Sequence, residues 1–305
     1  MTETFDVDLA AAEHDFGMRV YPADDPTGGM LVWLHGGAFM FGTLDMPEAD
    51  QVGRRLSATG TTVVSVDYIL APLDALAALP PAPSEEQMPT PEQMRAEAEA
   101  AGPRARFPVA SLQVVAAFDW AVANAQRFHA DPSMVALGGA SAGGNLAAGA
   151  ALRMRDRAET MPSALALVYP VLHSPLPAVD EELKALLVGL PSFLSFPPEM
   201  TVAINHNYLG QSADIEGYAF PGGRDLKGMP PTLIVNAERD RLRASGELFG
   251  AELDAAGVDV RVIRERGAKH GFLNTIGDPA AERTLTLLTD IAAGARLARD
   301  GPSAP

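Results

Sequence analysis

The chain has 305 residues, 47% hydrophobic and 20% charged, which suits a soluble α/β domain with insertions. With 39 acidic and 23 basic residues, its net charge of −16 excludes nucleic acid and anionic membrane partners, which need clustered Lys and Arg. The absence of cysteine excludes disulfides, thiolate zinc sites and a cysteine nucleophile. The acidic start "MTETFDVDLAAAEHDF" lacks the features of a signal peptide, and no apolar run could span a bilayer, so we expect a cytoplasmic protein.

Predicted strands alternate with predicted helices along most of the chain. A period-two stretch at 15–23 predicts an antiparallel edge strand. Apolar or β-branched runs predict strands at 30–35, 61–68, 134–139, 164–171, 231–238 and 258–265. Helical patterns occupy 47–59, 109–128, 142–158, 246–257 and 280–299. This alternation predicts a mostly parallel sheet flanked by helices and joined by right-handed crossovers.

Two segments interrupt the alternation, at 73–106 and 173–228. In the first, a Thr-Pro start and a Gly-Pro stop punctuate a predicted helix over 90–103. The second has no clear strand signal and two predicted helices, at 180–189 and 197–210. Both segments follow predicted strands, and such loops build the sites of open α/β sheets. We therefore expect a single domain over 1–305, with these two insertions forming a cap or lid.

The stretch "GASAG" (139–143) places Ser141 between a predicted strand and a predicted helix. A sharp strand-to-helix turn holds its central residue in strained geometry, and bulky neighbours would clash there. The flanking Gly139 and Gly143 indicate such a turn, which would present the hydroxyl of Ser141 as a nucleophile. The alternative is a Gly/Ala-rich helix start at which Ser141 is only an N-cap.

A second glycine-rich loop, "HGGAF", follows the strand predicted at 30–35. Exposed amides of such a loop can stabilise a developing oxyanion. We expect an oxyanion hole in which Gly37 and Ala38 donate, Gly36 allows close backbone approach, and Ala142, after the nucleophile, donates a third N–H. A tight turn at the strand end is the alternative.

A serine nucleophile needs a base, and the base needs an orienting acid. Asp240 lies just past the strand predicted at 231–238, and His270 lies in the loop after the next strand. We expect Asp240 and His270 to complete the site, with Glu238 as the competing acid that more simply braces the turn. The remaining histidines are interpreted as loop-fixing (His35), surface (His14, His129), structural (His173) and helical (His206) residues.

Together, "HGGAF", "VDYILAP", "GASAGGNLA", "NAERDRLR" and "KHGF" resemble the hormone-sensitive-lipase-like branch of the α/β hydrolases, the bacterial family IV esterases. The order Ser141, Asp240, His270 is also that of an α/β hydrolase. The resemblance implies an α/β-hydrolase fold with a mostly parallel eight-stranded sheet, and serine esterase chemistry without metal or organic cofactor. It further implies that Asp67 braces the site from below and that a homodimer is possible. We expect the apolar faces of the last strand and final helix to form the dimer interface.

The sequence also departs from this family. Only 34 residues precede His35, where family members usually carry cap helices, and the insertion 73–106 falls where the family passes directly from "LAPE" to "FP". Our hypothesis is that the insertion replaces the missing cap. Expected substrate-binding residues are Phe39 in the glycine loop, Met88 in the first insertion, and Phe193, Phe196 and Met200 in the second, with Met94 as a further apolar candidate.

The expected reaction is hydrolysis of small to medium carboxylic esters through an acyl-enzyme. Amide, carbamate or carbonate hydrolysis by the same triad stays open, because leaving-group choice depends on pocket geometry. A non-catalytic ligand-binding protein of the same fold is the alternative from another class, although such a protein would be expected to lose a triad residue.

Overall fold

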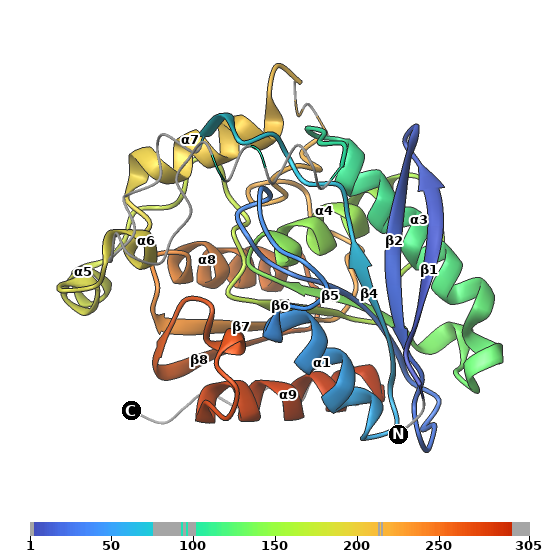
Figure 1. Ribbon diagram of the computed structural model, residues 1–305. Coiled ribbons are helices and arrows are strands. Elements are labelled where there is room, and N and C mark those ends of the chain that lie inside the picture. The colour runs from blue at the N-terminus through green and yellow to red at the C-terminus, as the bar shows by residue number, and fades with distance from the viewer. Residues whose placement is uncertain are drawn as a thin grey trace.

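A computed structural model describes residues 3–75, 93, 96, 102–212, 214 and 216–294, without the side chains of residues 192 and 193. Its centre is an eight-stranded sheet in the order β1-β2-β4-β3-β5-β6-β7-β8 (Figure 1). The strands are β1 (Phe5–Ala11), β2 (His14–Tyr21), β3 (Met30–Leu34), β4 (Thr62–Asp67), β5 (Val135–Ala140), β6 (Leu165–Val168), β7 (Thr232–Arg239) and β8 (Val260–Lys269). All pairs from β4 to β8 are parallel, whereas β1 and β2 pair antiparallel, which confirms the predicted mostly parallel sheet.

The helices follow the predicted alternation closely. They are α1 (Pro47–Ser57), α3 (Val109–Asn124), α4 (Ala142–Asp156), α5 (Glu181–Leu187), α6 (Ser192–Ser195), α7 (Pro198–Leu209), α8 (Arg243–Ala255) and α9 (Pro279–Ala292). Short 3-10 turns occupy Ala125–Phe128, Pro132–Met134 and Phe272–Asn274. None of the helices within the described ranges is long and apolar enough to cross a bilayer.

Two details of the prediction are wrong, namely the edge strand of the sheet and the end of the last helix. The strand predicted as the sheet edge, β2, is covered by β1, so the edge is formed by a strand that the prediction omitted. The last helix ends at Ala292, before a glycine with positive φ at Gly294, and not at residue 299. The helix predicted over 90–103 and most of the insertion 73–106 lie outside the described residues.

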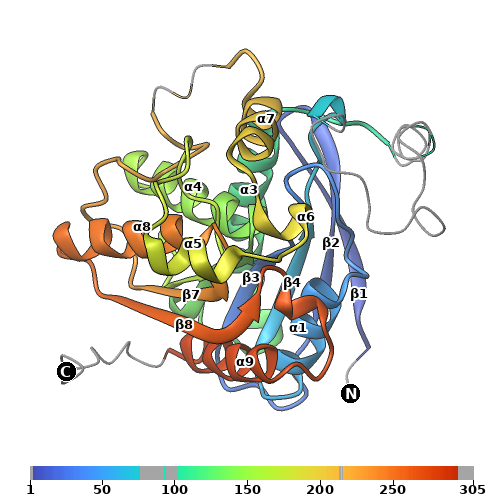
Figure 2. The same ribbon diagram turned by 90° about the vertical axis from the view of Figure 1, so that its left-hand side faces the viewer.

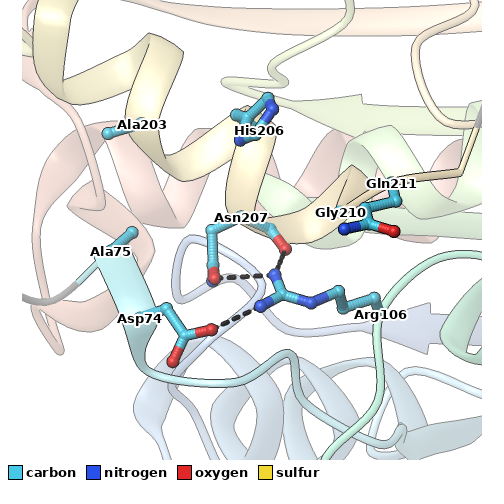
Figure 3. Close-up of a pocket in the computed structure, with 8 residues that line it drawn as sticks. All are labelled: Asp74, Ala75, Arg106, Ala203, His206, Asn207, Gly210 and Gln211. Carbon is cyan, nitrogen blue, oxygen red and sulfur yellow. Dashed lines mark hydrogen bonds and ion pairs between the residues drawn. The ribbon is translucent and has the colours of Figure 1, made fainter.

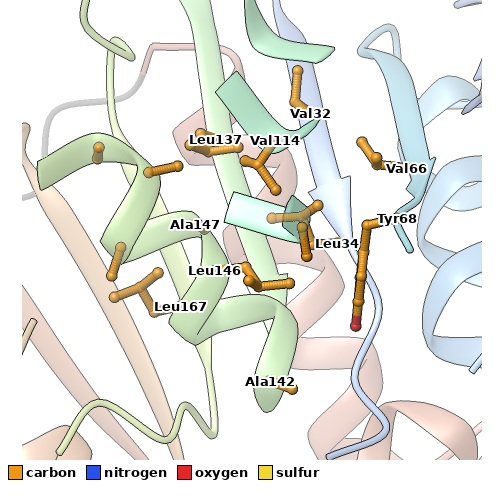
Figure 4. Packing of buried hydrophobic residues seen from close by; sticks show 14 of the residues in the cluster. Val32, Leu34, Val66, Tyr68, Val114, Leu137, Ala142, Leu146, Ala147 and Leu167 are labelled. Carbon is orange, nitrogen blue, oxygen red and sulfur yellow. The ribbon is translucent and has the colours of Figure 1, made fainter. Parts of the chain in front are cut away.

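Each face of the sheet carries its own apolar cluster. One face packs against α1 and α9, through residues such as Leu56 and Leu288, and the other against α3, α4 and α8 (Figure 1). Figure 4 shows the second cluster, in which Leu146 of α4 and Val114 of α3 lie against Leu34 of β3. Because both faces are covered, the central strands are continuously apolar, as is typical of parallel sheets.

The segment 173–228 adds α5, α6 and α7, which gather at one end of the sheet (Figure 2). Helix α7 buries Met200, Ile204 and Tyr208 in the same apolar cluster as α3 and α4. This end of the sheet is also where the chain leaves β5, β7 and β8. The fold therefore brings the loops after these three strands together beneath α6.

Candidate active site

Ser141 occupies a sharp turn between β5 and α4, the geometry predicted from its glycine-rich surroundings. Its backbone is strained, with φ 54° and ψ −114°, and its N–H donates to the Val168 carbonyl at 2.9 Å. A Cβ atom at Gly143 would lie 2.2 Å from the Leu34 carbonyl oxygen, and one at Gly139 would lie 2.5 Å from the backbone of Gly143. The strand and helix approach so closely here that only glycine fits.

The structure brings together Ser141, Asp240 and His270, which lie after β5, β7 and β8. Nε2 of His270 lies 3.0 Å from the Ser141 hydroxyl, and Nδ1 lies 2.6 Å from Oδ2 of Asp240. The Asp240 side chain is fully buried, and its Oδ1 accepts the Leu242 N–H at 2.9 Å. A carboxylate oxygen of Asp240 can only accept, so Nδ1 carries the imidazole proton and donates it to Asp240. Nε2 is then unprotonated and can accept a hydrogen bond from the Ser141 hydroxyl.

Two aromatic rings hold the His270 imidazole. The centroid of Tyr169 lies 4.8 Å from it at 59°, and that of Phe196, just after α6, lies 4.6 Å away at 71°. Phe196 was predicted as a pocket residue and contacts the imidazole from the cap side. Sequence reasoning missed Tyr169; a positive φ of 37° at a tyrosine directly after β6 is a structural signal that the sequence does not carry.

Glu48, which is 2% exposed and belongs to α1, links the glycine loop to the imidazole. Its Oε1 accepts the Gly36 N–H at 2.6 Å, and its Oε2 accepts the Tyr169 hydroxyl at 2.8 Å. Its backbone carbonyl accepts the Trp33 indole N–H at 2.7 Å. Sequence reasoning missed Glu48 and expected Asp67 to brace the site. Asp67 pairs with Gly17 in the sheet, and its side chain makes no hydrogen bond with the described residues, so its bracing role stays a prediction.

The glycine loop turns tightly after β3. Gly37 and Ala38 both have positive φ, 118° and 54°, and the Phe41 N–H closes the turn on the Gly37 carbonyl at 2.8 Å. The Gly36 amide is already donated to Glu48, so it is no longer available as a donor. Within the described ranges, the amides of Gly37, Ala38 and Ala142 make no hydrogen bond, which leaves them free to donate to a ligand.

The other predicted substrate-binding residues differ in their positions. Phe39 is 1% exposed and stacks on Tyr208 of α7 with centroids 4.0 Å apart, which is a packing contact between loop and helix. Met200 is also buried in the core. Met88 and Met94 lie outside the described residues, as does the side chain of Phe193. Their binding roles stay predictions.

Most of the remaining polar candidates have structural contacts. His35 stacks on Tyr68 at 4.6 Å, and its Nδ1 lies 2.7 Å from the Gly36 carbonyl oxygen. His173 is held between the hydroxyl of Ser245, at 2.8 Å, and Glu252, at 3.3 Å. Burial lowers the pKa of His35, which favours its neutral form. His129 and His206 are exposed and His14 is half-buried, and Glu238 accepts the Gly267 N–H at 2.7 Å as a turn brace.

A cavity of about 910 Å³ lies between α7 and the segments around Asp74 and Arg106 (Figure 3). Arg106 crosses its floor, pairs with Asp74, and donates to the side-chain oxygen of Asn207 at 2.9 Å. Ser141, Asp240 and His270 do not line this cavity, so it is separate from the candidate site.

The chain matches a protein family described as having the alpha/beta hydrolase fold, over residues 31–81 and 100–274. It is similar to an arylesterase from Saccharolobus solfataricus, with 27% identity over 94% of this chain and 81% of that protein. It is also similar to the carboxylesterase NlhH of Mycobacterium tuberculosis, with 30% identity over 88% of this chain and 76% of that protein.

Solved structures give the same result. An esterase from Pyrobaculum calidifontis superposes with a TM-score of 0.75 and 29% identity, covering 97% of this chain and 86% of that one. The thermostable carboxylesterase EstE1, cloned from a metagenomic library, superposes with a TM-score of 0.74 and 30% identity, covering 96% and 90%.

Proposed function

The chain belongs to the alpha/beta hydrolase fold family, and we propose that it is a serine carboxylesterase acting through Ser141, His270 and Asp240. One observation carries the proposal: the continuous hydrogen-bonded line from buried Asp240 through His270 to the Ser141 hydroxyl, at 2.6 and 3.0 Å. The esterases to which the chain is similar support ester hydrolysis as the reaction.

In the proposed reaction, the Ser141 oxygen attacks the ester carbonyl carbon while Nε2 of His270 takes the hydroxyl proton. Asp240 fixes the imidazole tautomer and stabilises its charged form. The tetrahedral oxyanion accepts hydrogen bonds from the free amides of Gly37, Ala38 and Ala142. The imidazolium then gives its proton to the leaving alcohol, and an acyl-enzyme remains.

The second half of the reaction uses the same groups. His270 takes a proton from water, the resulting hydroxide attacks the acyl carbon, and the new oxyanion occupies the same amides. Collapse breaks the bond to Ser141, whose oxygen recovers its proton from the imidazolium, and the carboxylic acid leaves. In this proposal, segments 173–228 and 73–106 form the cap, and Phe196 forms part of the wall beside His270. The apolar cap side chains favour small to medium acyl groups.

The test is a series of 4-nitrophenyl esters from acetate to decanoate, assayed with the native chain and with Ser141→Ala. The native chain is expected to prefer the shorter esters, and Ser141→Ala to lose about 10⁴-fold or more in kcat. Ser174→Ala serves as the matched control, because it removes a serine hydroxyl outside the proposed site. Equal turnover by the native chain and Ser141→Ala would refute the assignment of the nucleophile.

A further inference from the structure

A second, smaller cavity, of about 160 Å³, lies between α7, the loop after β6 and the loop after β7. A cavity of this size can hold a benzene-sized molecule. Its lining consists of Pro175, Leu176, Pro177, Ala178, Pro198, Thr201, Val202, Asn205 and Arg241. The wall is therefore mostly proline and aliphatic carbon, with three polar side chains.

The first of these polar side chains, Asn205, is buried without a partner. It is 2% exposed, and neither its Nδ2 nor its Oδ1 makes a hydrogen bond with any described residue. A buried amide in this state destabilises the free protein, and such groups in native proteins call for an explanation. Because Asn205 lines the cavity, a bound ligand that accepts a hydrogen bond from Nδ2 would explain why this amide has no partner in the protein.

The second feature is charge. Arg241 is the only charged residue in the lining, and within the described ranges it makes no ion pair. Its Nε donates to the Ser195 carbonyl at 3.3 Å. In contrast, Arg106 in the larger cavity is paired with Asp74. The guanidinium of Arg241 thus retains donors, and the residues that line this cavity include no acid that would neutralise it.

We propose that this cavity binds an alkyl carboxylate. The carboxylate is held by the Arg241 guanidinium and Nδ2 of Asn205, and its alkyl part packs against Leu176, Val202 and the prolines. An anion is favoured over a neutral ligand because the lining carries an unpaired positive charge. The aliphatic wall disfavours inorganic anions, which would leave it without contacts.

The location links this cavity to the proposed catalytic centre. Arg241 directly follows Asp240, and the carbonyl that it holds, of Ser195, precedes Phe196, whose ring contacts His270. The same carboxylate chemistry can come from two sources, a free short-chain acid or a carboxylate arm on an ester substrate. Binding of the free acid stands independently of the esterase proposal, whereas the substrate arm rests on it.

Binding is tested by calorimetric titration of the full chain with sodium butyrate, with butyramide as the neutral isostere. For a ligand of this size we expect a Kd on the order of 1 mM, with no binding of butyramide. Arg241→Gln and Asn205→Leu should each weaken butyrate binding about tenfold or more. Asn205→Leu should also raise the melting temperature of the free chain, because it removes an unpartnered buried amide.

Arg239→Gln is the matched control. Arg239 belongs to the same segment, and its Nε also donates to a backbone carbonyl, that of Leu186 at 3.2 Å, but it does not line the cavity. It should leave butyrate affinity unchanged. Butyrate binding that is equally tight in the native chain, Arg241→Gln and Asn205→Leu would overturn the proposal, because the acid would then bind elsewhere.

The source is distinguished by kinetics. If the carboxylate belongs to the substrate, the native chain should have a higher kcat/KM for mono(4-nitrophenyl) glutarate than for 4-nitrophenyl butyrate. Arg241→Gln should lower the ratio of these two kcat/KM values about tenfold. If it is a free acid, butyrate binds as above and the two esters show no Arg241-dependent difference. Absence of both effects overturns the proposal. Failure of the native chain to hydrolyse any ester would reject the esterase function and leave the butyrate titration valid.

Discussion

The link made by Glu48 permits a quantitative prediction. Its two carboxylate oxygens accept hydrogen bonds from the Gly36 N–H, at 2.6 Å, and from the Tyr169 hydroxyl, at 2.8 Å, in a site that is almost fully buried. In Glu48→Ala both donors are left buried without acceptors. At about 1.5–3 kcal/mol for each hydrogen bond to a charged group, the free energy of unfolding should fall by about 3–6 kcal/mol.

Activity should fall as well, because the Gly36 bond fixes the loop that carries Gly37 and Ala38. A displacement of this loop by about 1 Å would cost on the order of 10²-fold in kcat, and KM should change much less. Glu48→Gln keeps one acceptor oxygen for the Gly36 N–H. We therefore expect a smaller loss of about 1–2 kcal/mol in stability and about tenfold in kcat.

The assays are urea unfolding followed by tryptophan fluorescence, and steady-state hydrolysis of 4-nitrophenyl butyrate. Gln51→Ala is the matched control: Gln51 lies one turn along α1, is also buried, and has both amide atoms unpartnered among the described residues. It should change stability by about 1 kcal/mol or less. Stability of Glu48→Ala within about 1 kcal/mol of native would refute the energetic reasoning, and a normal kcat in a destabilised variant would refute the positioning of the loop.

Three further predictions concern the same region. Burial lowers the pKa of His35 from its ordinary 6.5, so below that pH the unfolded chain binds a proton that the native chain does not. The free energy of unfolding should therefore decrease as pH falls below 6.5, by up to about 1.4 kcal/mol per pH unit. In urea titrations at several pH values, His35→Gln should flatten this slope. Phe196→Ala removes a ring packed on the imidazole and should lower kcat about two- to tenfold with an unchanged melting temperature; an unchanged kcat would contradict a role for this contact. Gly143→Ala forces a Cβ to 2.2 Å from a backbone oxygen and should destabilise strongly in thermal melts, whereas Gly144→Ala, which meets a proline side chain at 3.0 Å, should be tolerated better; equal melting temperatures would be evidence against a closely packed turn.

Local patterns predict the sheet and the three central side chains well, because each lies next to a strand with a clear signal. The glycines around Ser141 report a local steric requirement, and Asp240 and His270 follow apolar strands directly. A parallel sheet brings the carboxyl ends of such strands to one edge, so chain order alone brings these residues close.

The missed strand β1 shows where such reasoning fails. Its hairpin turns at Ala12 and Glu13, which have positive φ of 53° and 64°. Two-residue hairpins of this geometry usually contain Asn or Gly, so the ordinary turn signal is absent. Without a turn signal after it, the sequence predicts no strand at Phe5–Ala11 despite its period-two pattern.

Contacts between distant segments are the other limit. Glu48 and Tyr169 are separated by 121 residues, and no local pattern pairs them. Phe39 is apolar and ends the glycine loop, and from the sequence such a residue could form either a pocket wall or part of the core. Only the placement of α7 shows that the Phe39 ring packs on Tyr208.

The burial of α7 in the main core has a consequence for how the molecule loosens. Because Phe39 and Tyr208 stack between the glycine loop and this helix, lifting α7 would open the central cluster itself. Its backbone amides should therefore exchange with solvent only in the opening events that also expose α3 and α4. The short helix α5 contributes no residue to this cluster and should exchange earlier. Heating should thus inactivate and unfold the protein in a single transition. No intermediate should accumulate in which α7 has detached while the sheet stays folded.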